Sequence, residues 1–255
     1  MKVDESFGDY LGNEAISSSD LKQYILCPAK FRKVESKESR SLEFGSALHD
    51  YVLCEGADTV LAPHLDLRRK ADKEEYNRLK LEYSNVVRGD DVKHIKGMKE
   101  SIQEHSPEFF EYIQSSDPEC SFYATCPESG LKLKARPDIY NKEKRAKLDL
   151  KTTVDAVKFI NQVYRYKYYI QDAFHSYVCE LSGYPVDISG WFAVEKEAPY
   201  VHRLVLIDKG TQMEMRQYVI DSLVKLAGSM RGEEGFPSLS PRLARQDFVY
   251  IGEDY

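Results

Sequence analysis

The chain has 255 residues, 42% of them hydrophobic and 31% charged, which is enough material for one substantial core. No apolar run approaches the roughly 18 residues that a membrane-spanning helix needs, and the mean hydropathy of −0.53 is that of a polar chain. The formal net charge of −6 argues against a general nucleic-acid coat protein, which would be basic. It leaves open an enzyme that acts on nucleic acid, because a metal site needs carboxylates and cations are needed only where phosphates lie.

The N-terminal segment and the cysteines indicate the compartment. Residues 1–10 are acidic and polar, without a basic start or an apolar stretch, so no signal peptide and no membrane association are expected. The five cysteines are scattered and form no CxxC pair, which disfavours a zinc ribbon or a disulfide-stapled secreted fold. We therefore expect a cytoplasmic protein with free thiols at Cys27, Cys54, Cys120, Cys126 and Cys179.

The first half of the chain has mainly helical patterns. Residues 1–15 are expected to form a loose lead-in. Residues 16–21 indicate a helix start, because serines can cap the free backbone N–H groups there, and the helix should break near Pro28. Apolar spacing predicts a buried helix over residues 41–54. Residues 70–115 are charged and mostly helical in pattern, so they are expected to form an outer helical insertion.

The second half alternates short strands with helices. Turns are predicted at residues 127–130 and 141–144, where polar residues interrupt alternating segments. The order of elements predicts one domain with a mixed sheet flanked by helices, an α/β or α+β core that ends in a tail over residues 232–255. The predicted strands are 120–126, 131–140, 146–150, 186–194 and 201–207, and the predicted helices are 166–181 and 211–230.

Two aspartates and a lysine form the most informative group in the sequence. If the segments ending at Asp138 and Asp149 are antiparallel neighbours, the two carboxylates meet at one end of the sheet. They would repel each other unless a cation lies between them, and a hard divalent ion with oxygen ligands satisfies both. Lys151 emerges on the same strand face as Asp149, two positions later. These are the residue types that metal-assisted phosphodiester hydrolysis requires.

Eight basic residues crowd the stretch that contains these aspartates. A run of charge is commonly no more than a solvated face, and that interpretation stays open here. The run also surrounds the candidate carboxylates, which favours contact with phosphates. Its members are Lys132, Lys134, Arg136, Lys142, Lys144, Arg145, Lys147 and Lys151.

Five motifs in this order resemble a known nuclease family. The chain is similar, from about residue 16 to about residue 207, to the C-terminal nuclease domain of exonuclease VIII (RecE) and its phage relatives. These belong to the RecB-like branch of the PD-(D/E)XK superfamily, so the resemblance implies that nuclease core with N-terminal helical additions. The motifs are Ile16-Ser17-Ser18-Ser19-Asp20-Leu21 with Cys27-Pro28-Ala29, Phe44-Gly45-Ser46-Ala47-Leu48-His49, Lys134-Ala135-Arg136-Pro137-Asp138, Leu148-Asp149-Leu150-Lys151-Thr152-Thr153, and Tyr169-Ile170-Gln171-Asp172-Ala173-Phe174.

The resemblance assigns roles to matching residues. It implies that His49, Asp138 and Asp149 ligate a metal ion, together with the backbone carbonyl of Leu150. It makes Lys151 the catalytic lysine. The implied cofactor is Mg²⁺, for which Mn²⁺ can substitute. Some RecB-like nucleases also hold an iron–sulfur cluster on four cysteines, but the cysteine spacing here does not match that pattern and none is expected.

The downstream helix motif both matches and departs from the family. Gln171 corresponds to a glutamine that supports the site or contacts DNA. Many RecB-like enzymes have tyrosine four positions later, where this chain has His175. Exposed N–H groups at a serine-rich helix start can hold a phosphate, although an ordinary serine cap is the simpler interpretation. The candidate DNA-binding residues are Ser17, Ser19, Arg32, Lys134 and Arg136.

The resemblance implies a 5′-to-3′ exonuclease that acts on the ends of double-stranded DNA and leaves single-strand tails for recombination. It also implies a homo-oligomeric ring, a single-strand annealing protein as partner, and a phage or prophage setting in a bacterial cell. Three alternatives stay open: a RecB-like endonuclease, a flap nuclease, and a non-catalytic module that binds DNA ends on a nuclease fold. The intact set of His49, Asp138, Asp149 and Lys151 counts against the last.

Overall fold

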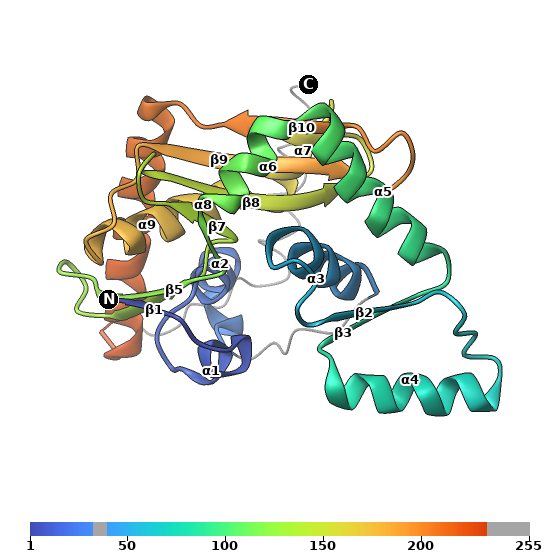
Figure 1. Ribbon diagram of the computed structural model, residues 1–255. Helices are drawn as coiled ribbons and strands as arrows, with labels where there is room; N and C mark the ends of the chain where they lie inside the picture. The colour runs from blue at the N-terminus through green and yellow to red at the C-terminus, as the bar shows by residue number, and fades with distance from the viewer. Residues whose placement is uncertain (33–39, 234–255) are drawn as a thin grey trace, which may run out of the picture.

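A mixed five-stranded sheet forms the centre of the molecule (Figure 1). The computed structural model describes residues 1–32 and 40–233. The central strand is parallel to one neighbour and antiparallel to the other, which confirms the predicted mixed sheet. In spatial order the strands are β10 (His202–Leu206), β9 (Ile188–Glu195), β8 (Ala146–Thr153), β7 (Ile139–Asn141) and β4 (Asp117–Pro118).

The two faces of this sheet carry different side chains, because successive strand residues point in opposite directions. On β8, Leu148 and Leu150 lie in the apolar cluster formed with α3, α5 and α6. Lys147 and Asp149 point to the other face, where the carboxylate of Asp172 on α8 meets Lys147. The helices are α3 (Arg40–Leu53), α5 (Asp90–His105), α6 (Pro107–Gln114), α7 (Phe159–Arg165), α8 (Tyr168–Leu181) and α9 (Lys209–Met230).

Two smaller sheets and an N-terminal helical layer complete the described fold. A three-stranded sheet has the order β1-β5-β6, and β2 pairs in parallel with β3. Helix α4 lies beside β2 and β3, apart from the five-stranded sheet (Figure 1). The bounds are β1 (Lys2–Val3), α1 (Phe7–Gly12), α2 (Ser18–Leu26), η1 (Pro28–Lys30), β2 (Thr59–Ala62), α4 (Lys70–Glu82), β3 (Asn85–Arg88), β5 (Ser121–Thr125) and β6 (Lys132–Ala135).

One expectation for the first half of the chain is wrong. Residues 1–15 are not a loose lead-in, since β1 pairs with β5 and α1 follows with Ser6 as its N-cap. Residues 70–115 are mostly helical, as expected, but β3 separates α4 from α5. The alternation in Asn85–Arg88 spans too few residues to reveal a strand inside so charged a segment.

The predicted strand over residues 131–140 is two strands in two different sheets. β6 pairs with β5, whereas β7 pairs with β8, and the chain changes sheet at Arg136-Pro137-Asp138. Proline has no N–H to donate to a strand ladder, so Pro137 suits the point of change. The helix α7 was not predicted, and most of the predicted tail at 232–255 lies outside the described residues. None of the described helices has the length and apolar character to cross a membrane.

Candidate metal-dependent active site

Asp138 and Asp149 lie opposite each other where β7 and β8 begin to separate. The antiparallel register pairs Ile139 with Leu148, which places the two aspartates in the next position. The backbone N–H of Asp138 donates to Asp149 Oδ1 at 3.3 Å, and the N–H of Leu150 donates to Asp138 Oδ2 at 2.8 Å. The predicted adjacency is thus confirmed, and backbone hydrogen bonds orient each carboxylate.

Lys151 extends over the same two carboxylates. Its Nζ lies 3.5 Å from Asp138 Oδ2, and only 13% of its side chain is exposed. Burial alone would lower the pKa of Lys151, but the charges of Asp138 and Asp149 outweigh it and raise the pKa. The ammonium therefore stays charged beside the aspartates. Its Nζ also lies 5.6 Å from the centre of the Tyr168 ring, at the start of α8.

His49 reaches the aspartates from α3, about a hundred residues away in the chain. Its Nε2–H donates to the carbonyl of Leu150 at 2.8 Å, because a carbonyl oxygen can only accept. In the neutral imidazole, Nδ1 then carries a lone pair, and it lies 3.6 Å from Asp138 Oδ1. Two lone pairs facing each other repel unless a positive charge lies between them. This pair of atoms is thus suited to a cation.

Asp149 is fully buried, and a second buried lysine holds its charge. Lys147 donates to Asp149 Oδ2 at 3.2 Å and to Asp172 Oδ1 at 2.5 Å. The side chains of Lys147 and Asp149 are both fully buried. Burial would raise the pKa of Asp149, but Lys147, followed by Lys151, holds it well below the usual range. The hydroxyl of Ser189 donates to the other oxygen of Asp172 at 2.8 Å. Asp149 is therefore a fixed anion.

His175, the position at which the chain departs from the RecB-like pattern, also lies close to Asp149. Its Nδ1 is 3.9 Å from Asp149 Oδ1 and, among the described residues, has no hydrogen-bond partner. Its Nε2 lies 3.3 Å from the hydroxyl of Ser18, which opens α2. Burial lowers the pKa of His175 to about 3, although Asp149 acts in the opposite direction. A neutral imidazole thus bridges α2 and the buried aspartate.

Gln171 occupies the same face of α8 as two residues that touch the site. Tyr168, Gln171 and His175 are spaced by three and four positions, which aligns them along one side of a helix. Tyr168 contacts Lys151 and His175 approaches Asp149, so half-buried Gln171 shares the side of α8 that borders the site. The supporting role that the resemblance implies stays a prediction.

The structure adds two residues that the sequence analysis missed. Lys22 lies one turn after Ser18 on α2, and burial, followed by the nearby charge of Lys151, lowers its pKa. Glu119 donates its backbone N–H to the carbonyl of Asp138 at 3.0 Å, and burial raises the pKa of its carboxyl group. Neither residue stands in a recognisable spacing with the aspartates, so the fold alone reveals them.

Two of the candidate DNA-binding residues have structural partners instead. Lys134 is only 5% exposed, and its ammonium donates to the carbonyls of Tyr10 and Asn13 at 2.7 and 2.6 Å. Arg136 donates to the hydroxyl of Ser121 at 2.9 Å and lies 3.6 Å from Glu119. Both cations thus fix the N-terminal segment and the sheet edge, and the expectation of DNA contact is corrected for them.

The remaining candidates surround the start of α2. Ser17 caps the helix by accepting from the N–H of Asp20 at 3.2 Å, and Asp20 completes a capping box. Its carboxylate therefore occupies the helix start where a phosphate was considered. Arg32 pairs with Asp20 at 3.3 Å and donates to the carbonyl of Glu14 at 2.7 Å. Ser19 is exposed, and its candidate role stays a prediction.

The donor atoms fit a divalent cation, which PD-(D/E)XK nucleases typically use. His49 Nδ1 and Asp138 Oδ1 face each other at 3.6 Å, whereas the Leu150 carbonyl lies at the other ring nitrogen, Nε2. No group of three His, Cys, Asp or Glu side chains around one point is present in the described part of the chain. The carboxylate of Asp149 points to Lys147. The residues that would hold the ion are thus His49 and Asp138, while the ligand roles of Asp149 and the Leu150 carbonyl stay predictions.

This sheet and its aspartates and lysine define a protein class, the PD-(D/E)XK nuclease fold. The chain belongs to the family described as "PDDEXK-like domain of unknown function (DUF3799)", which matches residues 17–237. The fold is similar to a crystal structure of a protein named "Putative exonuclease" from Eubacterium rectale. The TM-score is 0.64 at 14% sequence identity, over 99% of this chain and 100% of the other. A search of curated proteins found no match.

Proposed function

We propose that this protein is a metal-dependent nuclease that degrades double-stranded DNA from its ends in the 5′-to-3′ direction. One observation carries the nuclease assignment. His49 on α3 converges with Asp138, which immediately precedes β7, and with Lys151 on β8. This intact set counts against a fold that has lost its metal chemistry. The direction and the preference for ends rest on the resemblance to RecE-like nucleases.

The residues have separate tasks in this proposal. A divalent ion, when bound, would supply an activated water and polarise the phosphodiester. His49 and Asp138 would hold that ion. Lys151 places its ammonium beside them, where it donates to the attacking water or to a phosphate oxygen as negative charge develops. Lys147 keeps Asp149 ionised and oriented.

The proposed cofactor and assembly follow the same resemblance. Carboxylate oxygens favour Mg²⁺, and the imidazole allows Mn²⁺ to substitute. A homo-oligomeric ring around DNA would reconcile a net charge of −6 with basic residues gathered near the active site. The single-strand tails would then pass to an annealing protein. These features are proposals that extend the nuclease assignment.

Cleavage of linear and circular duplex DNA, with Mg²⁺ or with EDTA, tests the function. We expect linear DNA to yield mononucleotides in Mg²⁺, while circular DNA stays intact and EDTA stops the reaction. End-labelled substrates report the direction. Internal cuts in the circle would favour an endonuclease, and cleavage only at branched substrates would favour a flap nuclease. Binding to ends without any loss of DNA would identify a non-catalytic module and overturn the proposal.

A further inference from the structure

An exposed aromatic turn lies between α7 and α8, close to the active site in the chain. Tyr164 is 67% exposed and Tyr166 is 49% exposed, although tyrosine rings contribute most to folding when they are buried. Arg165 is exposed between them, and half-buried Lys167 follows. Two large exposed rings interleaved with two cations do not help to form the core, which makes this turn a candidate binding surface.

Contacts between side chains connect this turn to the catalytic lysine. Lys151 Nζ lies 5.6 Å from the centre of the Tyr168 ring, and the Tyr168 ring lies 5.6 Å from that of Tyr166. The guanidinium of Arg165 lies 5.5 Å from the Tyr166 ring. We call Tyr166, Tyr168, Arg165 and Lys151 the aromatic strip. Its successive contacts connect Lys151 in the active site with the exposed ring of Tyr166.

The fold holds the strip in place from beneath. Tyr168 stacks on Phe159, which is fully buried, with ring centres 6.2 Å apart. The turn between the helices is short, because Lys167 adopts a left-handed conformation with φ 53° and the next residue begins α8. Tyr166 and Tyr168 are thereby presented to the same side. The Tyr166 ring is exposed to solvent, whereas the Tyr168 ring is held by its stacking on Phe159.

We propose that the aromatic strip binds unpaired nucleotides of a DNA strand at the active site. This inference rests on the proposed nuclease function and names the part of its substrate that the strip contacts. Bases stack on aromatic side chains whatever their identity, and cations between the rings neutralise the phosphates. Internal bases of a duplex are already stacked and paired, so only an unpaired segment offers free faces. The strip thus selects DNA with a single-stranded segment over blunt duplex.

Binding measured in EDTA tests the strip separately from cleavage. The probes are a fluorescent duplex with a 3′ thymidine overhang and the same duplex with blunt ends, followed by anisotropy. We expect Tyr166→Ala to weaken overhang binding about tenfold, since stacking on one ring contributes on the order of 1–3 kcal/mol. Blunt-duplex binding should stay unchanged. Tyr166→Phe keeps the ring and should bind like the parent protein.

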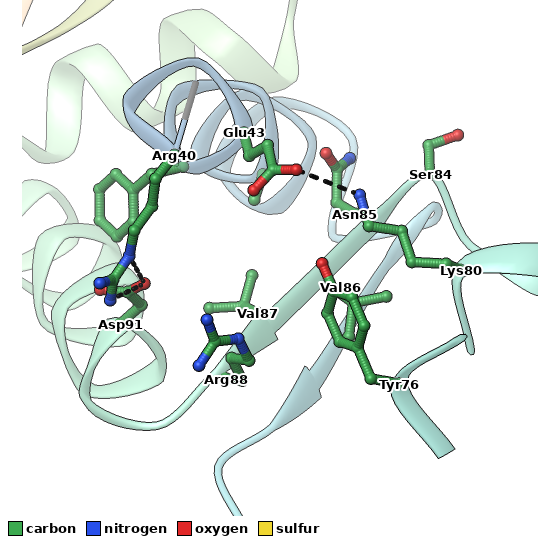
Figure 2. A pocket seen from close by; sticks show the side chains of 12 residues that line it. Arg40, Glu43, Tyr76, Lys80, Ser84, Asn85, Val86, Val87, Arg88 and Asp91 are labelled. Carbon is green, nitrogen blue, oxygen red and sulfur yellow. Dashed lines mark hydrogen bonds and ion pairs between the residues drawn. The ribbon is translucent and has the colours of Figure 1, made fainter. Parts of the chain in front are cut away.

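A matched control uses another tyrosine with a cation above it. Tyr76 on α4 has Lys80 Nζ 5.9 Å from its ring centre, in a separate charged hollow next to α3 (Figure 2). Tyr76→Ala should therefore leave both probes unaffected. Equal loss on both probes in Tyr166→Ala, or no loss on either, would overturn the inference. So would a change in oligomeric mass with unaltered DNA binding, which would identify a protein interface instead.

The two proposals fail in different ways. If the protein never cleaves DNA but prefers overhangs in a way that depends on Tyr166, the nuclease function is contradicted and the role of the aromatic strip is supported. If it cleaves DNA normally but binds overhangs equally well without the Tyr166 ring, the nuclease function is supported and the role of the strip is contradicted.

Discussion

The two aspartates of this site, Asp138 and Asp149, are held by different partners. Asp138 is fixed by the N–H of Leu150 and lies near the ammonium of Lys151, with 13% of its side chain exposed. Asp149 is fully buried against Lys147. The aspartates are therefore equivalent in the sequence pattern but not in their surroundings. Removing a carboxylate should affect catalysis in both cases and stability in only one.

We predict that Asp138→Asn and Asp149→Asn both abolish cleavage, whereas only Asp149→Asn strongly destabilises the apo protein. Loss of the Asp149 charge leaves Lys147 with Asp172 as its remaining buried anion, and losing a hydrogen bond between charged groups costs roughly 1.5–3 kcal/mol. Urea unfolding in EDTA, alongside cleavage assays in Mg²⁺, measures both effects. Normal activity in either variant would contradict the site, and equal stabilities would contradict the role of Lys147.

His175 predicts a dependence of stability on pH. Burial lowers its pKa to about 3 in the folded protein, below the 6.5 of an ordinary imidazole. The unfolded chain therefore binds the extra proton between these values, and the free energy of unfolding falls as pH falls through that window. Between about pH 7.5 and pH 5.5, the free energy of unfolding should therefore decrease. In EDTA, we expect this decrease to be smaller by about 1 kcal/mol in His175→Gln than in the parent protein.

The comparison needs an exposed histidine. His64→Gln serves, because the side chain of His64 is 61% exposed. Urea unfolding at both pH values gives the four free energies for each protein. If His175→Gln keeps the same pH dependence as His64→Gln, then His175 is not held neutral by burial.

At the scale of elements, local patterns were predictable and contacts between distant elements were not. The hairpin of β7 and β8 followed from alternating residues around one turn, and it placed Asp138 opposite Asp149. The position of His49 came only from the family resemblance, since α3 reaches β8 through packing over about a hundred residues of chain. The approach of α2 with Lys22 was not foreseen for the same reason. Burial of Lys134 and Lys147 was missed because a basic run usually indicates a solvated face.

The pairing of β9 with β10 depends on a glycine. A Cβ on Gly190 would lie 2.1 Å from the carbonyl oxygen of Val205 and 2.9 Å from Leu206 Cα, both in the backbone of β10. Since backbone cannot move aside as a flexible side chain does, Gly190→Ala should destabilise the protein by roughly 1–3 kcal/mol. Denaturant unfolding measures the change.

Gly45 provides the opposite case within the same chain. It lies inside α3, and a Cβ there would meet nothing within 4 Å. Alanine has the better helix propensity, so Gly45→Ala should stabilise the protein by roughly 0.5–1 kcal/mol. Two glycine-to-alanine changes with opposite signs would confirm that packing, rather than glycine content, sets the outcome. Equal effects would show that β10 can shift away from β9.

At the scale of the whole molecule, the acidic net charge disfavours a broad basic surface. In the proposed function, affinity for DNA would therefore come from a few cations near the active site. With Lys134, Lys147 and Arg136 engaged by protein groups, the basic run contributes less than its sequence suggests. Lys22 and the cations of the aromatic strip are placed to replace it. This distribution predicts a small number of phosphate contacts rather than a broad basic surface.

The salt dependence of DNA binding counts those contacts. Each phosphate neutralised by a lysine releases counterions and contributes a slope of about −0.9 to log K against log salt concentration. Burial, followed by the like charge of Lys151, lowers the pKa of Lys22, so a phosphate would relieve an unfavourable arrangement. We expect Lys22→Gln to reduce the slope for duplex binding in EDTA by about 1 and to weaken binding uniformly across sequences. Lys30→Gln is the control, because Lys30 is exposed at the end of η1. A slope unchanged by Lys22→Gln, or changed equally by Lys30→Gln, would show that DNA does not pass over α2 on its way to the aspartates.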